Sequence, residues 1–176
     1  MKLEMKSIKH SDFASQGTPC YEGHVYIDGK KSIHVSNDGR GGSDRYHSFN
    51  KIPYSIIREV DEWCKKNLPK WKMSSDGDAP KEYDTDFESW CHTQVHLWLR
   101  SKELKRLLNK DKIVYVKDND LYTWKNKSIK KIDDHILNRF KSVNKDIKII
   151  LNDMPFDKAL KTYNDYLDFD TINGGL

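Results

Sequence analysis

The sequence predicts an α+β fold in which an N-terminal antiparallel β-hairpin and sheet pack with about four helices and a second small hairpin. Apolar and polar residues alternate through much of the first fifty positions, which is typical of strands. From residue 53 onward apolar residues mostly recur at the helical period. No repeat or long linker interrupts the chain, so we expect a single α+β domain over residues 1–176, with the turn-rich segment 74–82 as the candidate subdomain border.

The clearest element is a hairpin formed by Tyr21–Ile27 and Lys31–Asn37, joined across Asp28 and Gly29. An Asp-Gly pair between alternating runs is a strong hairpin signal, because both residues tolerate positive φ. Residues 2–13 give a weaker strand pattern. We therefore expect the N-terminal region to be an antiparallel sheet built around this hairpin.

The length of the turn decides which side chains of the hairpin share a face. A strict two-residue turn would split the apolar residues between the two faces. A three-residue loop, with Gly29 in the left-handed bulge position, places Val25, Ile33 and Val35 together, and we expect this loop. The opposite, more polar face then carries Glu22, His24, Tyr26 and His34.

Two helices are predicted in the middle of the chain. Pro53 suits a first helical position, and the apolar stripe that follows includes Ile56, Val60 and Cys64. Thr85–Glu88 has the form of a capping box and opens the second helix. The apolar face of this helix carries Phe87, Trp90, Cys91, Val95 and Trp98. The helix then continues or kinks through Leu104, Leu107 and Leu108.

The last third of the chain predicts a second hairpin over residues 112–124, turned at Asp118–Asp120. Ser128 is expected to cap a short helix, because an apolar period follows it. Ile147–Leu151 reads as a strand, and Pro155 as the start of a last helix.

The composition bears on the compartment. No apolar run approaches the ~20 residues needed to cross a bilayer, and the N-terminus lacks the continuous apolar stretch of a signal peptide. The three cysteines, Cys20, Cys64 and Cys91, form no CxxC pair, which favours a reducing compartment. We therefore expect a cytoplasmic protein with no membrane partner and no cofactor.

The most unusual segment is the loop 36–47, with the sequence SNDGRGGSDRYH. Its three glycines allow positive φ, and consecutive amides in such a turn can form an anion-binding nest, beside which two arginines add forked donors for phosphate. It matches neither a P-loop nor a dinucleotide fingerprint. In the structural alternative, the two aspartates cap turns and pair with the arginines. The predicted ligand-binding residues are Asn37, Asp38, Gly39, Arg40, Gly41, Gly42, Asp44, Arg45 and His47.

Three histidines are the candidate catalytic residues. His24 and His34 share the polar face of the hairpin, and His47 returns nearby at the end of the loop. With Glu22 or Asp44 they would form an acid–base pair or a metal site. The alternative is that they are ordinary polar residues of a half-exposed sheet face.

A second set of candidate metal ligands lies on the helix that begins near residue 85. Glu88, His92 and His96 are spaced at i, i+4 and i+8. Two histidines four apart can grip one zinc ion, but the segment lacks the glutamate that follows the first histidine of a zinc peptidase helix. The alternative is a solvated helix face.

The net charge of +4 is unevenly distributed. Residues 100–148 contain 15 Lys and Arg against 7 Asp and Glu, an excess that can steer a polyanion or an acidic partner. Aromatic and basic residues interleave over 115–125, which suits single-stranded nucleic acid, although half of the rings on a hairpin must face the core. The alternative is a set of solvated lysines.

Two segments carry a resemblance to a known group of proteins. The run VSNDGRGGSDRYH at 35–47, preceded by YIDGK at 26–30, and the LNxxPFDxAL pattern at 151–160 resemble small uncharacterised proteins of phages, prophages and plasmids. The resemblance implies a mobile genetic element as the setting and the host cytoplasm as the location. It carries over no activity.

These features lead to one hypothesis and two alternatives. The first is a phage or mobile-element accessory protein, more plausibly a binder than an enzyme, which engages a phosphate-bearing or acidic target, a nucleic acid, a nucleotide or a host protein, and inhibits a host defence system in an anti-CRISPR-like manner. The first alternative is a metal- or histidine-dependent phosphoesterase or nuclease. The second is a protein–protein antagonist that acts through the acidic segment 74–88.

Overall fold

The computed structural model describes residues 1–49, 52–73, 81–109 and 111–173, and it confirms the α+β class, since helices accompany antiparallel sheets. The chain divides into two compact units, Met1–Trp98 and Leu99–Leu176, and the boundary falls within the long helix α2 (Phe87–Leu108). Residues 74–80 of the expected subdomain border lie outside the described residues. The expectation of a single domain stays a prediction.

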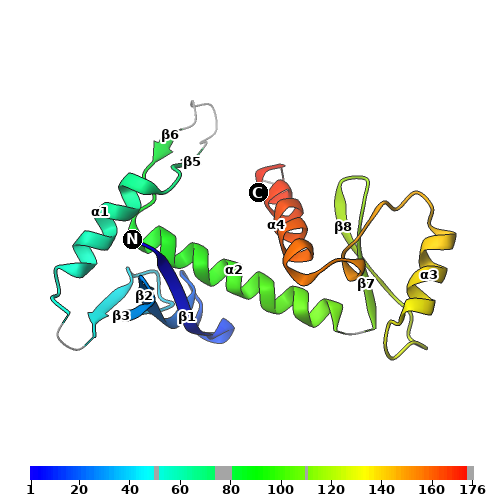
Figure 1. Cartoon of the computed structure of the whole chain (residues 1–176), viewed down its shortest axis with the longest axis horizontal. Helices are drawn as coiled ribbons and strands as arrows, with labels where there is room; N and C mark the ends of the chain where they lie inside the picture. The colour runs from blue at the N-terminus through cyan, green and yellow to red at the C-terminus, as the bar shows by residue number, and fades with distance from the viewer. Residues whose placement is uncertain (50–51, 74–80, 110, 174–176) are drawn as a thin grey trace. The chain divides into compact units, whose positions relative to one another are not determined.

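The first unit is built on a four-stranded antiparallel sheet (Figure 1). Its strands are β1 (Leu3–His10), β2 (Cys20–Ile27), β3 (Lys30–Asp38) and β4 (Arg45–Ser48), hydrogen-bonded in that order. The weak strand pattern near the N-terminus therefore corresponds to an edge strand. Strand β4 lies within the segment that the sequence predicted as a continuous loop, so the connection after β3 is shorter than expected.

The expected three-residue loop between β2 and β3 is wrong, but the faces that it predicted are right. Ile27 pairs with Lys30 across a two-residue turn, in which Asp28 and Gly29 both have positive φ, 48° and 80°. A bulge at Ser32 then shifts the register by one residue. The extra residue shifts the alternation of β3 by one position, as a three-residue loop would have done. The buried face therefore carries Val25, Ile33 and Val35.

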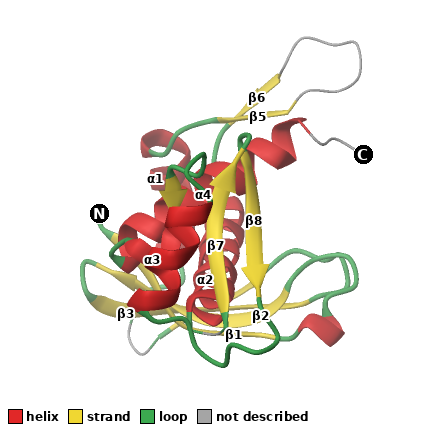
Figure 2. Cartoon of the chain, turned by 90° about the vertical axis from the view of Figure 1, so that its right-hand side faces the viewer, coloured by secondary structure: helices red, strands yellow, loops and turns green. Residues whose placement is uncertain are grey.

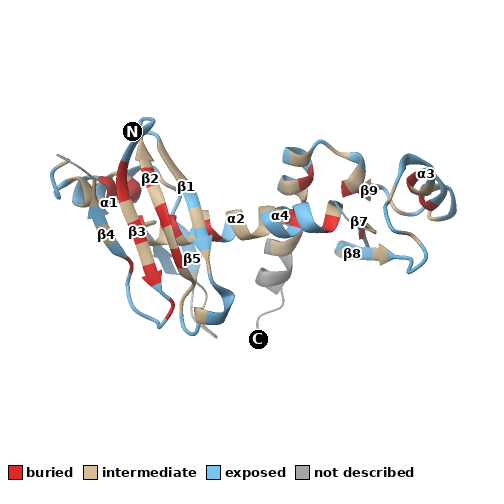
Figure 3. Ribbon diagram, turned by 90° about the horizontal axis from the view of Figure 1, so that it is seen from below, coloured by how far each residue is buried: buried red, intermediate tan, exposed pale blue. Residues whose placement is uncertain are grey.

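Helix α1 (Ile56–Asn67) and the first half of α2 complete the first unit. Val60 and Cys64 of α1 are buried, together with Phe87, Trp90, Cys91 and Val95 of α2. Buried positions alternate with half-buried ones along β2 and through the middle of β3, as Figure 3 shows. The apolar stripes of both helices are therefore the ones that the sequence predicted.

The starts of both helices differ from the prediction. Pro53 lies outside α1, where its carbonyl oxygen accepts a hydrogen bond from the Ile56 amide at 3.1 Å. The predicted capping box does not form, because Asp86 caps α2: its carboxylate accepts from the Ser89 amide at 2.8 Å. The Thr85 hydroxyl donates instead to the Pro69 carbonyl at 2.6 Å.

A short hairpin pairs β5 (Trp71–Met73) with β6 (Lys81–Tyr83), and β6 lies within the acidic segment 74–88. The sequence predicted a loop at residues 81 and 82, so this ladder was missed. Trp71 stacks on Tyr83 with ring centroids 4.8 Å apart, a cross-strand aromatic pair of the kind that stabilises two-stranded ribbons.

The second unit contains a three-stranded sheet of order β8-β7-β9, in which β7 and β8 lie side by side (Figure 2). The strands are β7 (Lys112–Lys117), β8 (Asp120–Lys125) and β9 (Ile149–Ile150). One core cluster joins the sheet to the end of α2 and to the last helix, and a second cluster joins it to α3. The buried residues are Leu104, Leu107, Val114, Val116, Leu151, Ala159 and Tyr163 in the first, and Ile113, Leu137, Phe140 and Ile150 in the second.

Helix α3 (Asp134–Val143) begins later than predicted, because Asp133, and not Ser128, is its N-cap and accepts from the Ile136 amide at 2.9 Å. Helix α4 (Phe156–Asn173) follows Pro155 as expected. Among the described helices, none combines the length and the apolar character needed to cross a bilayer.

Candidate functional site

The predicted ligand-binding loop connects β3 to β4 and divides into a buried part and an exposed part. Asn37, Gly39 and Asp44 are buried, whereas Arg40, Gly41, Gly42 and Ser43 at the tip are exposed. Asp38, Arg45 and His47 are also exposed, on the opposite side of the strands from the core. The loop is therefore anchored on the side that faces the core and exposed to solvent on the other side.

Asn37 holds the base of the loop through four hydrogen bonds. Its carbonyl oxygen accepts from the Thr18 hydroxyl at 2.8 Å and from the Gly39 amide at 2.9 Å. Its amide group donates to the Gly42 carbonyl at 2.8 Å and to the Asp44 carboxylate at 3.0 Å. All the hydrogen-bonding capacity of this buried side chain is used, which fixes the loop conformation.

Gly39 is required by packing. Its φ is +80°, and an added Cβ would lie 2.2 Å from the Ala14 carbonyl oxygen and 2.7 Å from the Cys20 Cβ. Its own carbonyl oxygen accepts from the amides of Gln16 at 2.7 Å and Gly17 at 2.9 Å. This glycine docks the loop on the segment between β1 and β2.

In the anion nest expected from the glycines, the amides already donate to side chains of the loop and to Thr18. The amide of Gly39 donates to Asn37, that of Arg40 to Asp38 at 3.3 Å, and that of Gly41 to the Thr18 hydroxyl at 3.3 Å. These three amides are therefore not available to a ligand. An added Cβ at Gly41 or Gly42 would meet no atom within 4 Å, so the tip faces open space.

The two arginines differ in their surroundings. The guanidinium of Arg45 donates to the Asp38 carboxylate at 2.7 Å, and the two side chains are 68% and 45% exposed. The exposed side chain of Arg40 has no carboxylate partner among the described residues. Arg45 also lines a cavity of about 370 Å³, together with Lys9, His10 and Asp38.

The structure brings the three candidate catalytic histidines into one row on the outer face of the sheet. His24 pairs with His34, and His34 with His47, with ring centroids 5.4 Å and 6.3 Å apart. His34 Nε2 lies 3.8 Å from a Glu22 oxygen. Burial, with Lys31 and His34 nearby, lowers the pKa of His24. The row shares a face with Arg45, because alternate strand residues point the same way.

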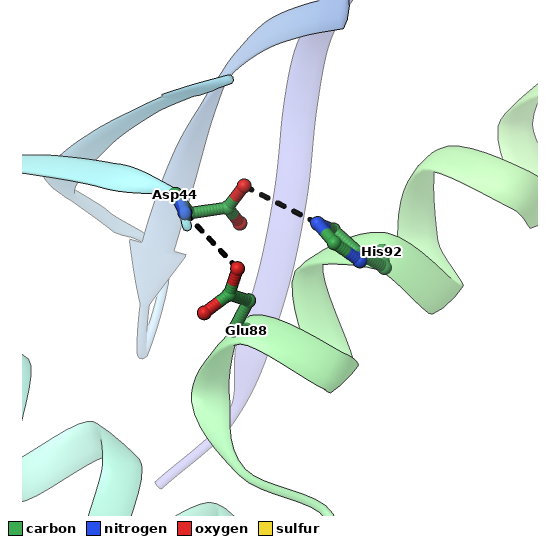
Figure 4. Close-up of side chains that lie close together, drawn as sticks. All are labelled: Asp44, Glu88 and His92. Carbon is green, nitrogen blue, oxygen red and sulfur yellow. Dashed lines mark hydrogen bonds and ion pairs between the residues drawn. The ribbon is translucent and has the colours of Figure 1, made fainter. Parts of the chain in front are cut away.

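The remaining candidate metal ligands form a different group from the one expected. Asp44, Glu88 and His92 each offer one ligand atom, and these atoms all lie within 4.8 Å of one another (Figure 4). Among the described residues, no other group of three or more His, Cys, Asp or Glu side chains brings its ligand atoms within this distance of one another. His96 is exposed and lies outside it. The predicted trio of Glu88, His92 and His96 is therefore replaced by one in which the loop supplies Asp44.

Asp44 is the centre of this group. Its side chain is 0% exposed, and its carboxylate accepts hydrogen bonds from the Tyr21 hydroxyl and from Asn37, with a longer contact of 3.5 Å from the Tyr46 hydroxyl. His92 Nε2 lies 3.3 Å from the same carboxylate, and the Asp44 amide donates to Glu88 at 3.0 Å.

The protonation states follow from this arrangement. Burial raises the pKa of the Tyr21 and Tyr46 hydroxyls above its ordinary value, so both remain protonated donors to Asp44. The hydrogen bond to Asp44 raises the pKa of His92 against the opposing effect of burial, and Glu88 and Asp86 add to the rise. The pKa of the neighbouring Cys91 thiol is also raised by burial, so it stays an inert core residue.

The sequence did not indicate Tyr21 and Tyr46 as members of this site. The alternation along β2 places Tyr21 on the core face, and a tyrosine in a core needs a hydrogen-bond partner for its hydroxyl. That requirement is the signal that points to a buried acceptor. It does not identify Asp44, because the contact depends on how the loop folds back.

Other predicted interfaces are partly used for packing. Tyr115 and Trp124 both contact Phe140, with centroids 5.4 and 5.5 Å away, whereas Tyr122 stays exposed. In the acidic segment, Asp84 pairs with Lys70 at 2.9 Å and Asp86 caps α2; Asp76 and Asp78 lie outside the described residues.

Comparisons with protein-family models, with curated proteins and with solved structures found no match to this chain.

Proposed function

We propose that this protein is a phage or mobile-element accessory factor that binds a phosphate-bearing or acidic target through the exposed half of the loop between β3 and β4. Arg40 and Arg45 supply the charge, and the target is a nucleic acid, a nucleotide or an acidic surface of a host protein in the host cytoplasm. Inhibition of a host defence system is the biological role that this binding would serve.

The observation that carries the proposal is the contrast within the loop. The buried side chains of Asn37 and Asp44 hold its base, and Arg40 to Ser43 are exposed to solvent. A cationic tip on a fixed base loses little conformational entropy on binding, which favours affinity. A loop that only connected two strands would not need so many buried hydrogen bonds at its base.

The pairing of Arg45 with Asp38 does not prevent binding. Both side chains are largely exposed, and surface ion pairs of this kind contribute between 0 and about 1 kcal/mol. A phosphate offers Arg45 a bidentate acceptor with more charge, so exchange of partners is favourable. Lys9 and the histidine row extend the same outer face.

The proposal is tested with fluorescent single-stranded DNA and RNA oligonucleotides at several salt concentrations. Affinity is expected to fall as salt rises, and the Arg40→Ala/Arg45→Ala double variant to bind about tenfold or more weakly, with a salt slope smaller by about 1.5. The double variant Arg58→Ala/Lys66→Ala removes the same charge outside the loop and outside residues 100–148, and it serves as the control. Equal affinities and slopes for the wild-type protein and the loop variant would refute the role of the loop.

The histidine row keeps a histidine-dependent phosphoesterase as the second candidate. His24, His34 and His47 lie on the face that Arg45 shares, so a bound phosphate would lie beside them. This candidate requires turnover of the same oligonucleotides, and it requires that replacement of His34, the central member, by Gln abolish that turnover. Binding without turnover across common divalent ions leaves the binder as the function.

A further inference from the structure

The cluster where the loop meets α2 combines the ligand types and spacing of a metal centre. We propose that Asp44, Glu88 and His92 bind one first-row divalent cation of the zinc class. The imidazole is a borderline donor beside two hard carboxylates, and this mixed set suits Zn²⁺, Mn²⁺, Fe²⁺ or Co²⁺ more than Mg²⁺, which prefers oxygen ligands alone. The proposal concerns a site separate from the outer face of the sheet and does not rest on the proposed function.

The distances already suit an ion. Zinc binds His nitrogen and carboxylate oxygen at roughly 2.0–2.2 Å, so two tetrahedral ligand atoms lie about 3.4 Å apart. Asp44 Oδ1 and His92 Nε2 are separated by 3.3 Å. Since no pair within the group exceeds 4.8 Å, the Glu88 carboxylate needs to move by roughly 1.5 Å or less to complete the set.

Helix geometry places the two α2 ligands for joint binding. Glu88 and His92 are four residues apart, so they lie on one face of the helix, one turn from each other. Both point toward the loop in Figure 4, where Asp44 faces them. Three ligands from two elements, with one element rigid, are an arrangement that holds coordination geometry.

The charge balance around the group favours a cation. Two carboxylates, Asp44 and Glu88, lie beside a single imidazole, and no Lys or Arg pairs with either carboxylate among the ion pairs of the described residues. Asp86 adds a further negative charge near His92. A protonated His92 balances only one of the two carboxylates, and a dication would offset the remaining negative charge.

The surroundings of Asp44 resemble the outer shell of a metal site. The Tyr21 hydroxyl and the Asn37 amide both donate to its carboxylate, which fixes the orientation of the ligand oxygen. The Tyr21 ring meets the His92 ring edge-on at 6.0 Å and limits its rotation. Both ligands are therefore held before an ion arrives.

An ion would be reachable from solvent. Glu88 lines a cavity of about 550 Å³ together with Tyr46, Asp86 and Phe87. His92 is 26% exposed, whereas Asp44 is 0% exposed. Three protein ligands also leave a coordination position for water or a phosphate oxygen, as in catalytic and not structural zinc sites.

The test uses the full-length, untagged chain after chelation. Co²⁺ is titrated while its visible absorption is recorded, Zn²⁺ is added in competition, and bound metal is counted by elemental analysis after dialysis. We expect one ion per chain and a tetrahedral Co²⁺ spectrum that Zn²⁺ abolishes. Glu88→Gln and His92→Gln are each expected to weaken binding by about 100-fold or more, and Tyr21→Phe by roughly tenfold.

His96→Ala is the matched control, since it removes a histidine from the same helix and should bind like the wild-type protein. Both glutamine variants keep a good helix former at partly exposed positions, and circular dichroism confirms that they are folded. The proposal is overturned if the wild-type chain retains no metal at micromolar free Zn²⁺. It is equally overturned if both glutamine variants bind as tightly as the wild-type protein.

Discussion

Replacement of Asp44 by Ala is predicted to be among the most destabilising changes in the loop. The substitution removes the acceptor for the Tyr21 hydroxyl and for the Asn37 amide, both of which are buried, and the counter-charge of His92. A buried donor that loses its partner costs about 1–3 kcal/mol, and breaking a buried ion pair costs about 3–5 kcal/mol. The free energy of unfolding is expected to fall by about 3–5 kcal/mol.

Asp38→Ala provides the matched control, because it removes the same side chain from the same loop. The Asp38 carboxylate is 45% exposed and pairs with an exposed arginine, so its loss should cost less than about 1 kcal/mol. Urea unfolding followed by circular dichroism gives both values, and hydrogen exchange locates the loss within residues 1–98. If the two variants differ by less than about 1 kcal/mol, the carboxylate is not the brace that the contacts indicate.

Two other predictions concern the same region. The pKa of His92 is raised in the folded state, so its pairing with Asp44 stabilises the fold fully below about pH 6.5. This contribution is lost as the pH rises through the pKa of the folded protein. Thermal melts between about pH 6 and 8 should therefore show a larger loss of stability for the wild-type protein than for His92→Gln. Parallel melts with equal pH slopes would contradict this. Gly39→Ala should cost more than about 3 kcal/mol, because it combines a φ of +80° with a clash at 2.2 Å, whereas Gly41→Ala, at +84° in open space, should cost only about 1–2 kcal/mol. Equal melting temperatures for the two alanine variants would count against the packing role of Gly39.

The faces of the N-terminal hairpin were predictable because side chains on a strand alternate with a period of two. A three-residue loop and a two-residue turn followed by one bulged residue shift that period by the same amount. The burial of Val25, Ile33 and Val35 therefore followed from the pattern although the turn itself did not. The apolar pattern predicts which side chains share a face of the hairpin. It does not predict whether the extra residue lies in the turn or in a bulge at Ser32, because that depends on tertiary packing.

The sequence predicted two of the three residues of the proposed metal site. The i, i+4 spacing places Glu88 and His92 on one face of a helix wherever that helix lies. His96 could not join them, because residues eight apart lie about 12 Å apart along the helix axis. The third ligand comes from Asp44, 44 residues before Glu88 in the chain, and a contact of that range depends on the tertiary fold.

The loop contributes side chains to both faces of the sheet, because Asp44 and Arg45 are neighbours at the start of β4. Consecutive strand residues point to opposite faces, so the carboxylate turns inward to His92 while the guanidinium turns outward to Asp38. The proposed ion and the proposed anionic target therefore never compete for a ligand, and each can be removed by substitutions that leave the other intact. The ion would nevertheless stiffen the residue next to Arg45. Any gain in anion affinity that it produced would, by thermodynamic linkage, be matched by an equal gain in metal affinity when the target binds.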